Sequence, residues 1–165
     1  MVLRILIRMS DGLDVFAKAV SLVFLSVITM ITIAEVIWRT FFMSITWSEE
    51  VSTTFLGTWF IFIGAAVPLK KGQLVSIQFI QSILPQQIAK VVTFAGELMI
   101  LCFLFVGIKY GFDLVSLTMT QPSPALMRPM GYAYLGIPVG CAIMFFQTVV
   151  LMIRRKATSE VSTLA

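Results

Sequence analysis

The chain has 165 residues, of which 59% are hydrophobic and 12% charged, and its mean hydropathy is +0.99. Soluble domains carry about a quarter charged residues, so this composition predicts a membrane protein. There is no histidine, which excludes histidine-based acid–base catalysis and histidine metal sites. Cys102 and Cys141 lie far apart in apolar runs and form neither a metal motif nor a disulfide framework. We expect no nucleic-acid binding, because the basic residues flank apolar segments and form no continuous patch.

Four segments, taken in chain order, are long and apolar enough to cross a bilayer, which requires about 20 residues of helix. The first, about 19–40, carries no charge from Ala19 to Ala34, and Glu35 lies near its end. The second, about 51–69, carries no charge at all. We interpret the first segment as a retained helix and not as a cleaved signal peptide, because its apolar run is long and no A-x-A-like site follows.

The third segment, about 88–110, has Glu97 as the only charge in its apolar part, and the fourth, about 129–153, lies between Arg128 and the run 154–156. Lipid offers the backbone no hydrogen-bond partner, and the alternation typical of strands is absent. We therefore predict an all-α membrane protein with four transmembrane helices. Residues 1–156 form its single domain, and 157–165 form a short, disordered cytoplasmic tail.

The Lys and Arg residues predict the orientation of the helices, because cytoplasmic loops are enriched in both. With both termini in the cytoplasm, nine of the 12 basic residues lie inside and three outside. The inner group is Arg4, Arg8, Lys18, Lys70, Lys71, Lys90, Arg154, Arg155 and Lys156, and the outer group is Arg39, Lys109 and Arg128. The outer connections also carry the acids Glu35, Glu49, Glu50 and Asp113.

The connection between the second and third spans contains a candidate interfacial helix, residues 74–84. Its apolar side chains share one broad face of a helical wheel, opposite Gln78, Gln81 and Ser82. This pattern favours a short amphipathic helix in the cytoplasmic interface, ended by Pro85. Two alternatives remain open: the segment is part of a long, tilted third span, or it is an irregular loop.

The connection between the third and fourth spans contains two prolines, in Gln121-Pro122-Ser123-Pro124. Prolines so close together stop a helix and favour an extended turn. The third helix is therefore expected to project beyond the bilayer to about Thr120.

Few polar residues could carry chemistry inside the membrane. For Glu97 we favour a structural role, as partner of a basic or hydrogen-bonding group on a neighbouring helix, over proton or ion transfer. Glu35 and Arg39 lie four residues apart and can pair with each other as an anchor. No nucleophile, base or metal-ligand set supports enzymatic activity, and no cofactor is expected.

The start of the second span carries Trp47-Ser48-Glu49-Glu50. Ser48 can cap the helix, and the two glutamates suit the positive end of its dipole. Trp59, in the middle of that span, is expected to pack against protein and not against headgroups. A glycine-rich face of the fourth span, Gly131, Gly136 and Gly140, is expected to pack on another protein.

The order of these motifs resembles the small membrane subunit (DctQ-type) of tripartite ATP-independent periplasmic (TRAP) transporters, over nearly the whole chain. The resemblance rests on Arg39, Trp47-Ser48-Glu49-Glu50, Trp59, Gly64-Ala65-Ala66, Lys71-Gly72, Ser123-Pro124-Ala125-Leu126, Pro129-Met130-Gly131, Tyr134, Pro138 and Gly140. One position departs from it: that family usually has histidine after the basic-Gly pair, where this chain has Gln73.

The resemblance implies a small subunit in the bacterial inner membrane that forms a heterodimer with a large, elevator-type permease subunit and braces it as static scaffold. It also implies sodium-coupled import of an organic anion, delivered by a transient periplasmic substrate-binding protein. On this basis we expect partner contacts at Trp47, Glu49, Glu50, Trp59, Glu97 and Arg128. Membrane anchoring, with lipids as partners, is expected from Arg39, Lys70, Lys71, Arg154 and Arg155.

Two other functions remain open. A self-contained small transporter also has four helices, but its essential acid lies in the middle of the first span, whereas Glu35 lies near the end. The second alternative is a membrane assembly factor without transport activity. The sequence does not identify the cargo among dicarboxylates, other carboxylates, sialic acids and sulfonates.

Overall fold

The computed structural model describes residues 2–41, 46–70 and 86–163, and these are helical except for 119–130 and Leu135. Four helical stretches are long and apolar enough to span a membrane: Leu6–Phe41, Trp47–Lys70, Val91–Thr118 and Gly131–Arg155. The prediction of an all-α membrane protein with four such helices is confirmed for the described part of the chain. The candidate interfacial helix, 74–84, the predicted membrane anchor Lys71 and the departing position Gln73 lie outside the described residues.

The first helix, α1, is continuous from Val2 to Phe41. Its 40 residues extend for about 60 Å at 1.5 Å per residue, twice the thickness of a bilayer core of about 30 Å. Its exposed hydroxyl side chains are satisfied locally: those of Ser26, Thr29 and Thr32 each donate to the carbonyl four residues earlier. An otherwise apolar face can therefore carry hydroxyl groups without leaving donors unpaired in lipid.

The second span is built from three consecutive helical pieces, α2 (Thr46–Glu50), the π-helical turn η1 (Val51–Leu56) and α3 (Gly57–Lys70). The wider turn of a π-helix is a local insertion in an otherwise regular helix. Gly57 follows it directly, and a Cβ there would lie 3.0 Å from the carbonyl oxygen of Ser52. Glycine at position 57 thus leaves room for the carbonyl oxygen of Ser52, five residues earlier in the same span.

The third span, α5 (Gln86–Thr118), ends two residues short of the predicted Thr120. The fourth is interrupted: α6 (Gly131–Tyr134) and α7 (Gly136–Thr163) are separated by Leu135. Pro138 explains the interruption, because it has no N–H for the carbonyl of Tyr134, and its ring crowds that carbonyl. Helix α7 then continues to Thr163, so the predicted disorder of the tail is wrong for residues 157–163.

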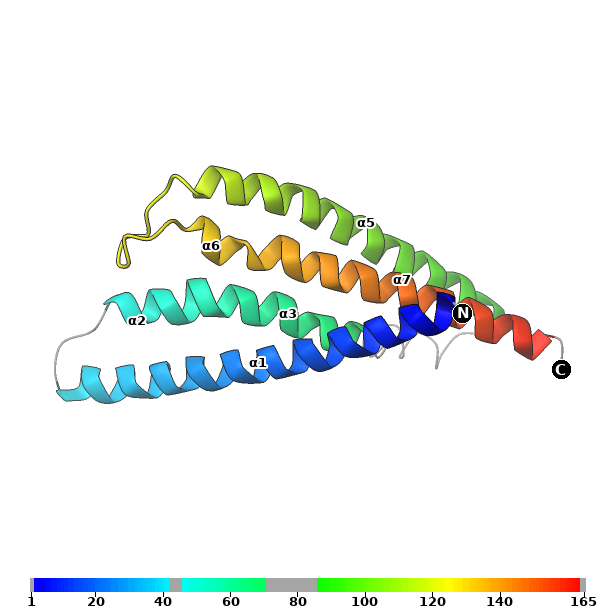
Figure 1. Ribbon diagram of the computed structural model, residues 1–165, viewed down its shortest axis with the longest axis horizontal. Coiled ribbons are helices and arrows are strands. Elements are labelled where there is room, and N and C mark those ends of the chain that lie inside the picture. The colour runs from blue at the N-terminus through cyan, green and yellow to red at the C-terminus, as the bar shows by residue number, and fades with distance from the viewer. Residues whose placement is uncertain (1, 42–45, 71–85, 164–165) are drawn as a thin grey trace.

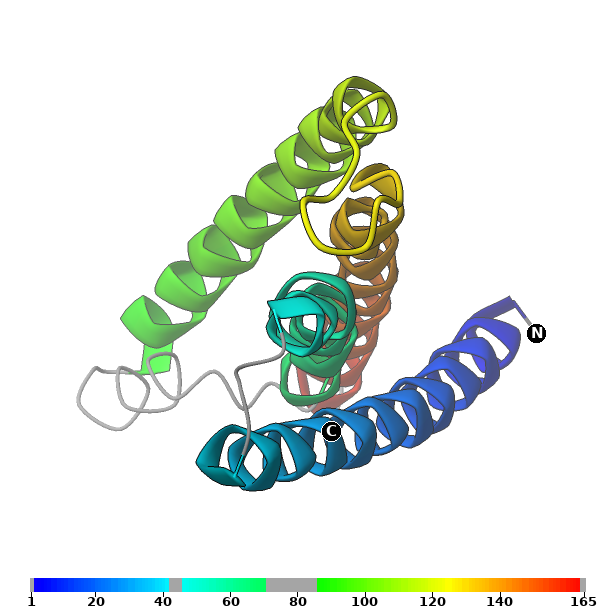
Figure 2. The same ribbon diagram turned by 90° about the vertical axis from the view of Figure 1, so that its left-hand side faces the viewer.

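The long helices lie side by side in the order α1, α3, α7 and α5 (Figure 1). Within the described ranges, the backbone of α5 comes close only to the backbones of α6 and α7, and not to those of α1 or α3. Figure 2, which views the protein along the helices, shows α5 and α1 on opposite sides of the central pair α3 and α7. The four spans therefore form an open, curved layer and not a closed four-helix bundle.

The buried core of this layer is small and lies where α3, α5 and α7 meet. It consists of Ala66, Leu69, Leu104, Cys141 and Met144. Large apolar side chains cover the outside instead, and no residue in the most apolar stretch of α1 is buried. A surface of this kind is compatible with lipid or with another membrane subunit, and not with water.

The glycines of the fourth span pack inside the chain, so the predicted glycine-rich docking face is wrong. A Cβ on Gly140 would lie 2.5 Å from Cβ of Phe62, and one on Gly136 would lie 3.1 Å from Cα of Trp59. Gly131 similarly faces Met119, at 2.8 Å. These positions let α7 approach α3, and α6 approach the end of α5, at backbone distance.

Candidate functional site

The turn between α5 and α6 forms a compact structure at one end of the layer, opposite the chain termini (Figure 1). We call this end, which also contains the start of α2, the loop end. Ser123 is completely buried. Its N–H donates to the carbonyl of Arg128 at 2.8 Å, and its carbonyl accepts from the N–H of Met127 at 3.0 Å. The turn is therefore a folded unit held by Ser123.

Glu50 connects this turn to the second span. Its Oε2 accepts a hydrogen bond of 2.9 Å from the backbone N–H of Ala125. Glu50 is one of the predicted partner contacts, and the fold joins it to the predicted proline turn. Trp47, Glu49 and Arg128, three of the predicted partner contacts, are exposed at the same end.

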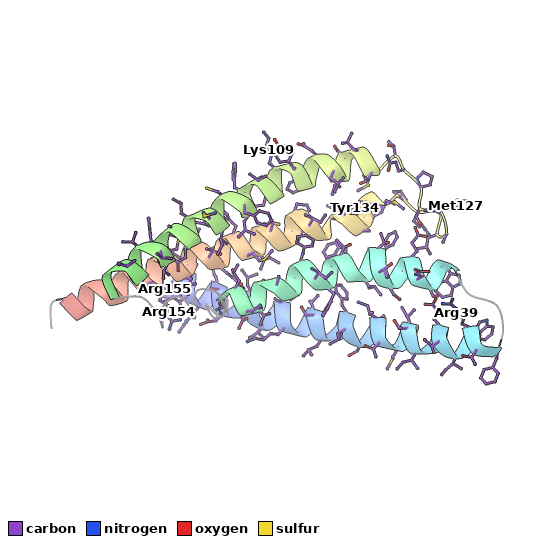
Figure 3. The ribbon with its side chains drawn as sticks, turned by 180° about the vertical axis from the view of Figure 1, so that it is seen from behind. Arg39, Lys109, Met127, Tyr134, Arg154 and Arg155 are labelled. Carbon is purple, nitrogen blue, oxygen red and sulfur yellow. The ribbon has the colours of Figure 1, made fainter. Side chains whose placement is uncertain are left out.

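Met127 is the most unusual residue of the turn. It has a φ of 53° and is the only non-glycine residue of the described chain with a positive φ. Its side chain is 77% exposed and lies at the tip of the loop end (Figure 3). The turn thus holds a strained backbone and presents an apolar side chain outward.

Trp59 has an internal role. Its Nε1–H donates to the carbonyl of Tyr132 at 3.1 Å, and its ring lies against Gly136. The expectation that Trp59 packs against protein is met within the chain. Its predicted contact with a partner subunit stays a prediction.

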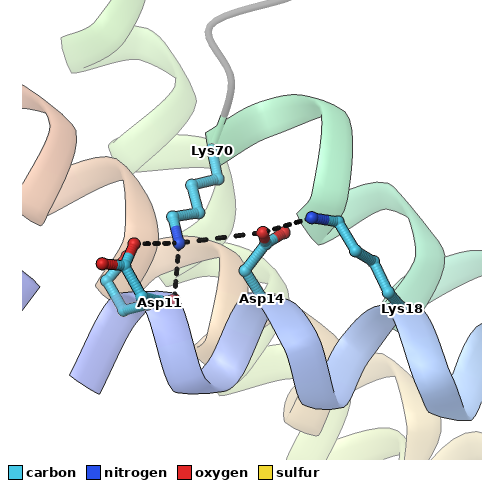
Figure 4. A network of polar contacts seen from close by, with 5 residues as sticks. Asp11, Asp14, Lys18 and Lys70 are labelled. Atoms are coloured by element: carbon cyan, nitrogen blue, oxygen red, sulfur yellow. Dashed lines mark hydrogen bonds and ion pairs between the residues drawn. The ribbon is translucent and has the colours of Figure 1, made fainter. Parts of the chain in front are cut away.

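A group of charges ties α1 to the end of α3 (Figure 4). The Nζ of Lys70 donates to the carbonyl of Ser10 at 2.9 Å and to Asp11 at 2.8 Å, and it lies 3.8 Å from Asp14. Lys18 pairs with Asp14 at 2.6 Å. We call these four charged residues and Ser10 the ion cluster; it lies near the chain termini, at what we call the terminal end. Lys70, predicted as a membrane anchor, therefore forms its hydrogen bonds and ion pairs with α1.

Glu97 pairs with Arg155 of α7, with 2.5 Å between Oε1 and Nη1. Arg155 is the basic partner on a neighbouring helix that the structural interpretation of Glu97 expects, and the choice between a structural role and proton or ion transfer stays a prediction. Arg155 and Arg154 lie at the terminal end (Figure 3). Arg39 is exposed at the loop end, and Lys109 lies on the outward side of α5. Whether any of these basic residues anchors the protein in lipid stays a prediction.

Most of the site contacts that sequence reasoning missed join distant parts of the chain. The Asp14–Lys18 pair has a local signal, the spacing of four residues on one helix. The pairing of Lys70 with Asp11 spans 59 residues and has none. In the described part of the chain, no group of three or more acidic or cysteine side chains could hold a metal ion.

The family model of the DctQ component of tripartite ATP-independent periplasmic transporters matches residues 28–158. The matched region contains α3, α5 and most of α7, together with the loop end, but not the part of α1 that contributes to the ion cluster. No curated protein matches the chain.

Proposed function

This chain belongs to the DctQ component family of tripartite ATP-independent periplasmic transporters, and we propose that it is the static scaffold for the large permease subunit of such a transporter. In this proposal the large subunit imports an organic anion by an elevator-type movement driven by a sodium gradient. The two subunits form a heterodimer in the bacterial inner membrane, with both termini of this chain in the cytoplasm. A soluble periplasmic protein delivers the anion.

The observation that carries the proposal is the open layer of helices. An elevator needs a stationary wall wide enough to resist being dragged by the moving domain. Four long helices side by side, with large apolar side chains outside and a small core, make a wide wall with little interior. A compact bundle of the same length would present less surface to lipid and to a partner.

Polar contacts between helices at both ends of the layer support the scaffold role. Glu50 joins the second span to the turn before α6 at the loop end. At the terminal end the ion cluster joins α1 to α3, and Glu97–Arg155 joins α5 to α7. Each neighbouring pair of long helices thus has a polar tie or a backbone-distance glycine contact, which is what a rigid support requires.

Reconstitution tests the scaffold role directly. The large subunit is placed in proteoliposomes with or without this chain, and sodium-driven uptake of the anion is measured with the binding protein present. We expect uptake only when both subunits are present and no uptake by this chain alone. Solute movement by the purified chain alone would instead support the self-contained transporter.

The residues at the loop end divide into two groups for the docking of the binding protein. Trp47, Glu49 and Arg128 are exposed and free to meet another protein, and we propose them as docking residues. Glu50 acts first as a positioning residue, because its carboxylate already accepts the N–H of Ala125. Trp59 and Glu97 are likewise engaged inside the chain, so a contact with the large subunit is a secondary role for both.

Glu49→Lys separates these roles. It leaves the Glu50–Ala125 contact in place, so we expect normal folding and assembly but weaker binding-protein docking, seen as a raised KM for the loaded binding protein. Glu50→Gln is the matched control, since an amide oxygen can still accept from Ala125. Unchanged docking by the Glu49→Lys complex would exclude Glu49 from the docking surface.

A further inference from the structure

A buried amide in the fourth span has no partner within the protein. The side chain of Gln147 is 1% exposed, and neither its Nε2 nor its Oε1 makes a hydrogen bond with the described residues. It lies in α7, next to Thr148, within a mostly apolar stretch of the span. Burying an amide without hydrogen bonds is strongly unfavourable, and nearly all buried side-chain amides have a partner in protein or water.

A small cavity lies beside this amide. Its volume is about 20 Å³, and its polar lining consists of Ser10 and Asp11 of α1, Lys70 of α3, and Gln147 and Arg154 of α7. Aliphatic side chains of α1 and α7 complete the wall. The cavity therefore joins the unpartnered amide to the ion cluster, where three helices meet.

The size of the cavity and the charges that line it indicate which molecule can occupy it. A cavity of about 10–15 Å³ is enough for one water molecule if two to four polar groups line it. The cavity is partly open to the surface, and its volume of about 20 Å³ matches one water molecule better than the several heavy atoms of a phosphate or carboxylate group. A cation would meet two positive side chains, Lys70 and Arg154, against the single acid Asp11.

We propose that this cavity is a binding site for one structural water molecule, which hydrogen-bonds the Gln147 amide and bridges it to the ion cluster. Lys70 and the carboxylate of Asp11 supply a donor and an acceptor on the other side. The water links α7 to the α1–α3 pair at the terminal end. It thereby extends the ion cluster into a polar junction of three helices.

The first test detects the water itself. The full-length chain, labelled with ¹⁵N-glutamine and embedded in lipid bilayers, is studied by solid-state NMR with magnetisation transfer from water to side-chain amides. We expect a cross peak between water and the Gln147 amide. Gln121, which is exposed at the loop end, is the positive control. A spectrum in which Gln121 shows the peak and Gln147 does not overturns the proposal.

The second test uses stability. Gln147→Met keeps a similar volume but removes both polar atoms, so with a bridging water we expect a melting temperature about 2–4 °C lower. Without a bridging water, the substitution removes an unpartnered amide and raises the melting temperature, which contradicts the proposal.

Combining Gln147→Met with Lys70→Met measures the energetic coupling between the two side chains. If one water serves both side chains, the double variant loses less than the sum of the single losses. The matched control is Thr148→Val, whose hydroxyl donates within α7 to the carbonyl of Met144. Its effect should add to that of Lys70→Met. Additive effects for Gln147 as well would exclude the bridge, and if the Lys70 variant does not fold, the direction of the Gln147→Met shift still decides.

Discussion

At the residue scale, Glu97 of α5 and Arg155 of α7 form an ion pair near the terminal end of the layer. The side chain of Glu97 is 7% exposed and that of Arg155 is 38% exposed. Because Arg155 is the last residue of the fourth apolar stretch, its partner Glu97 lies level with the boundary of that span. A carboxylate held there by arginine is an interhelical tie between α5 and α7, not an isolated charge at the bilayer centre.

Removal of the Glu97–Arg155 ion pair should reduce the stability of the protein more than it changes the sodium dependence of uptake. We expect Glu97→Gln to lower the free energy of unfolding by about 1–2 kcal/mol, towards the lower end for charged hydrogen bonds because Arg155 is partly exposed. Thermal unfolding of the chain in lipid measures this, and the swap Glu97→Arg with Arg155→Glu should recover part of the loss. Intact assembly with lost sodium dependence of uptake would show that Glu97 serves coupling instead.

At the element scale, the helices approach one another through glycines that have specific neighbours. Gly140 faces Phe62 of α3, and Gly111 faces Pro138 of α7, where a Cβ would lie 3.1 Å from the proline Cδ. Both contacts involve the fourth span, which is the central element of the layer together with α3. By contrast, Gly12 and Gly96 have nothing within 4 Å of an added Cβ.

Two alanine substitutions separate packing from helix propensity. Gly140→Ala should push α7 away from α3, because the carbonyl carbon and oxygen of Phe62 would lie 2.8 and 2.9 Å from the new methyl group. We expect it to lower the free energy of unfolding by about 1–3 kcal/mol. Gly96→Ala, in the interior of α5 with open space around it, should be neutral or stabilising by up to about 1 kcal/mol. Thermal unfolding in lipid compares the two, and equal effects would refute the packing argument.

At the scale of the whole molecule, both chain termini lie at one end of the layer, and the turn before α6 lies at the other (Figure 1). Lys and Arg favour the cytoplasmic side of a membrane. The terminal end carries Arg8, Lys18, Lys70, Arg154 and Arg155, so this end is expected to face the cytoplasm. The Glu50-linked turn then faces the periplasm, where a binding protein can reach it.

Cysteine labelling in intact cells tests this orientation. With Cys102 and Cys141 replaced by serine, Met127→Cys at the loop end should react with a membrane-impermeant maleimide. Met9→Cys, on an exposed side chain of α1, should react only after the membrane is permeabilised. The opposite pattern would invert the topology and remove the periplasmic docking surface.

The sequence by itself determined the membrane class, the four apolar helices and the end of α5 before the prolines of the turn. These depend on local properties: the length of an apolar run, the missing N–H of proline and the charges that flank each span. It also identified Glu50, Trp59 and Glu97 as notable side chains, but not what each of them contacts.

Only the tertiary structure decided how the helices are arranged and which polar groups meet. The ties Glu50–Ala125, Lys70–Asp11 and Glu97–Arg155 join residues 75, 59 and 58 positions apart. No periodicity in one helix specifies such a pair, because each depends on which faces of two distant helices pack together. The same holds for the glycines of the fourth span. Their close contacts within the chain depend on how α7 packs against α3, which the sequence of the fourth span alone does not specify.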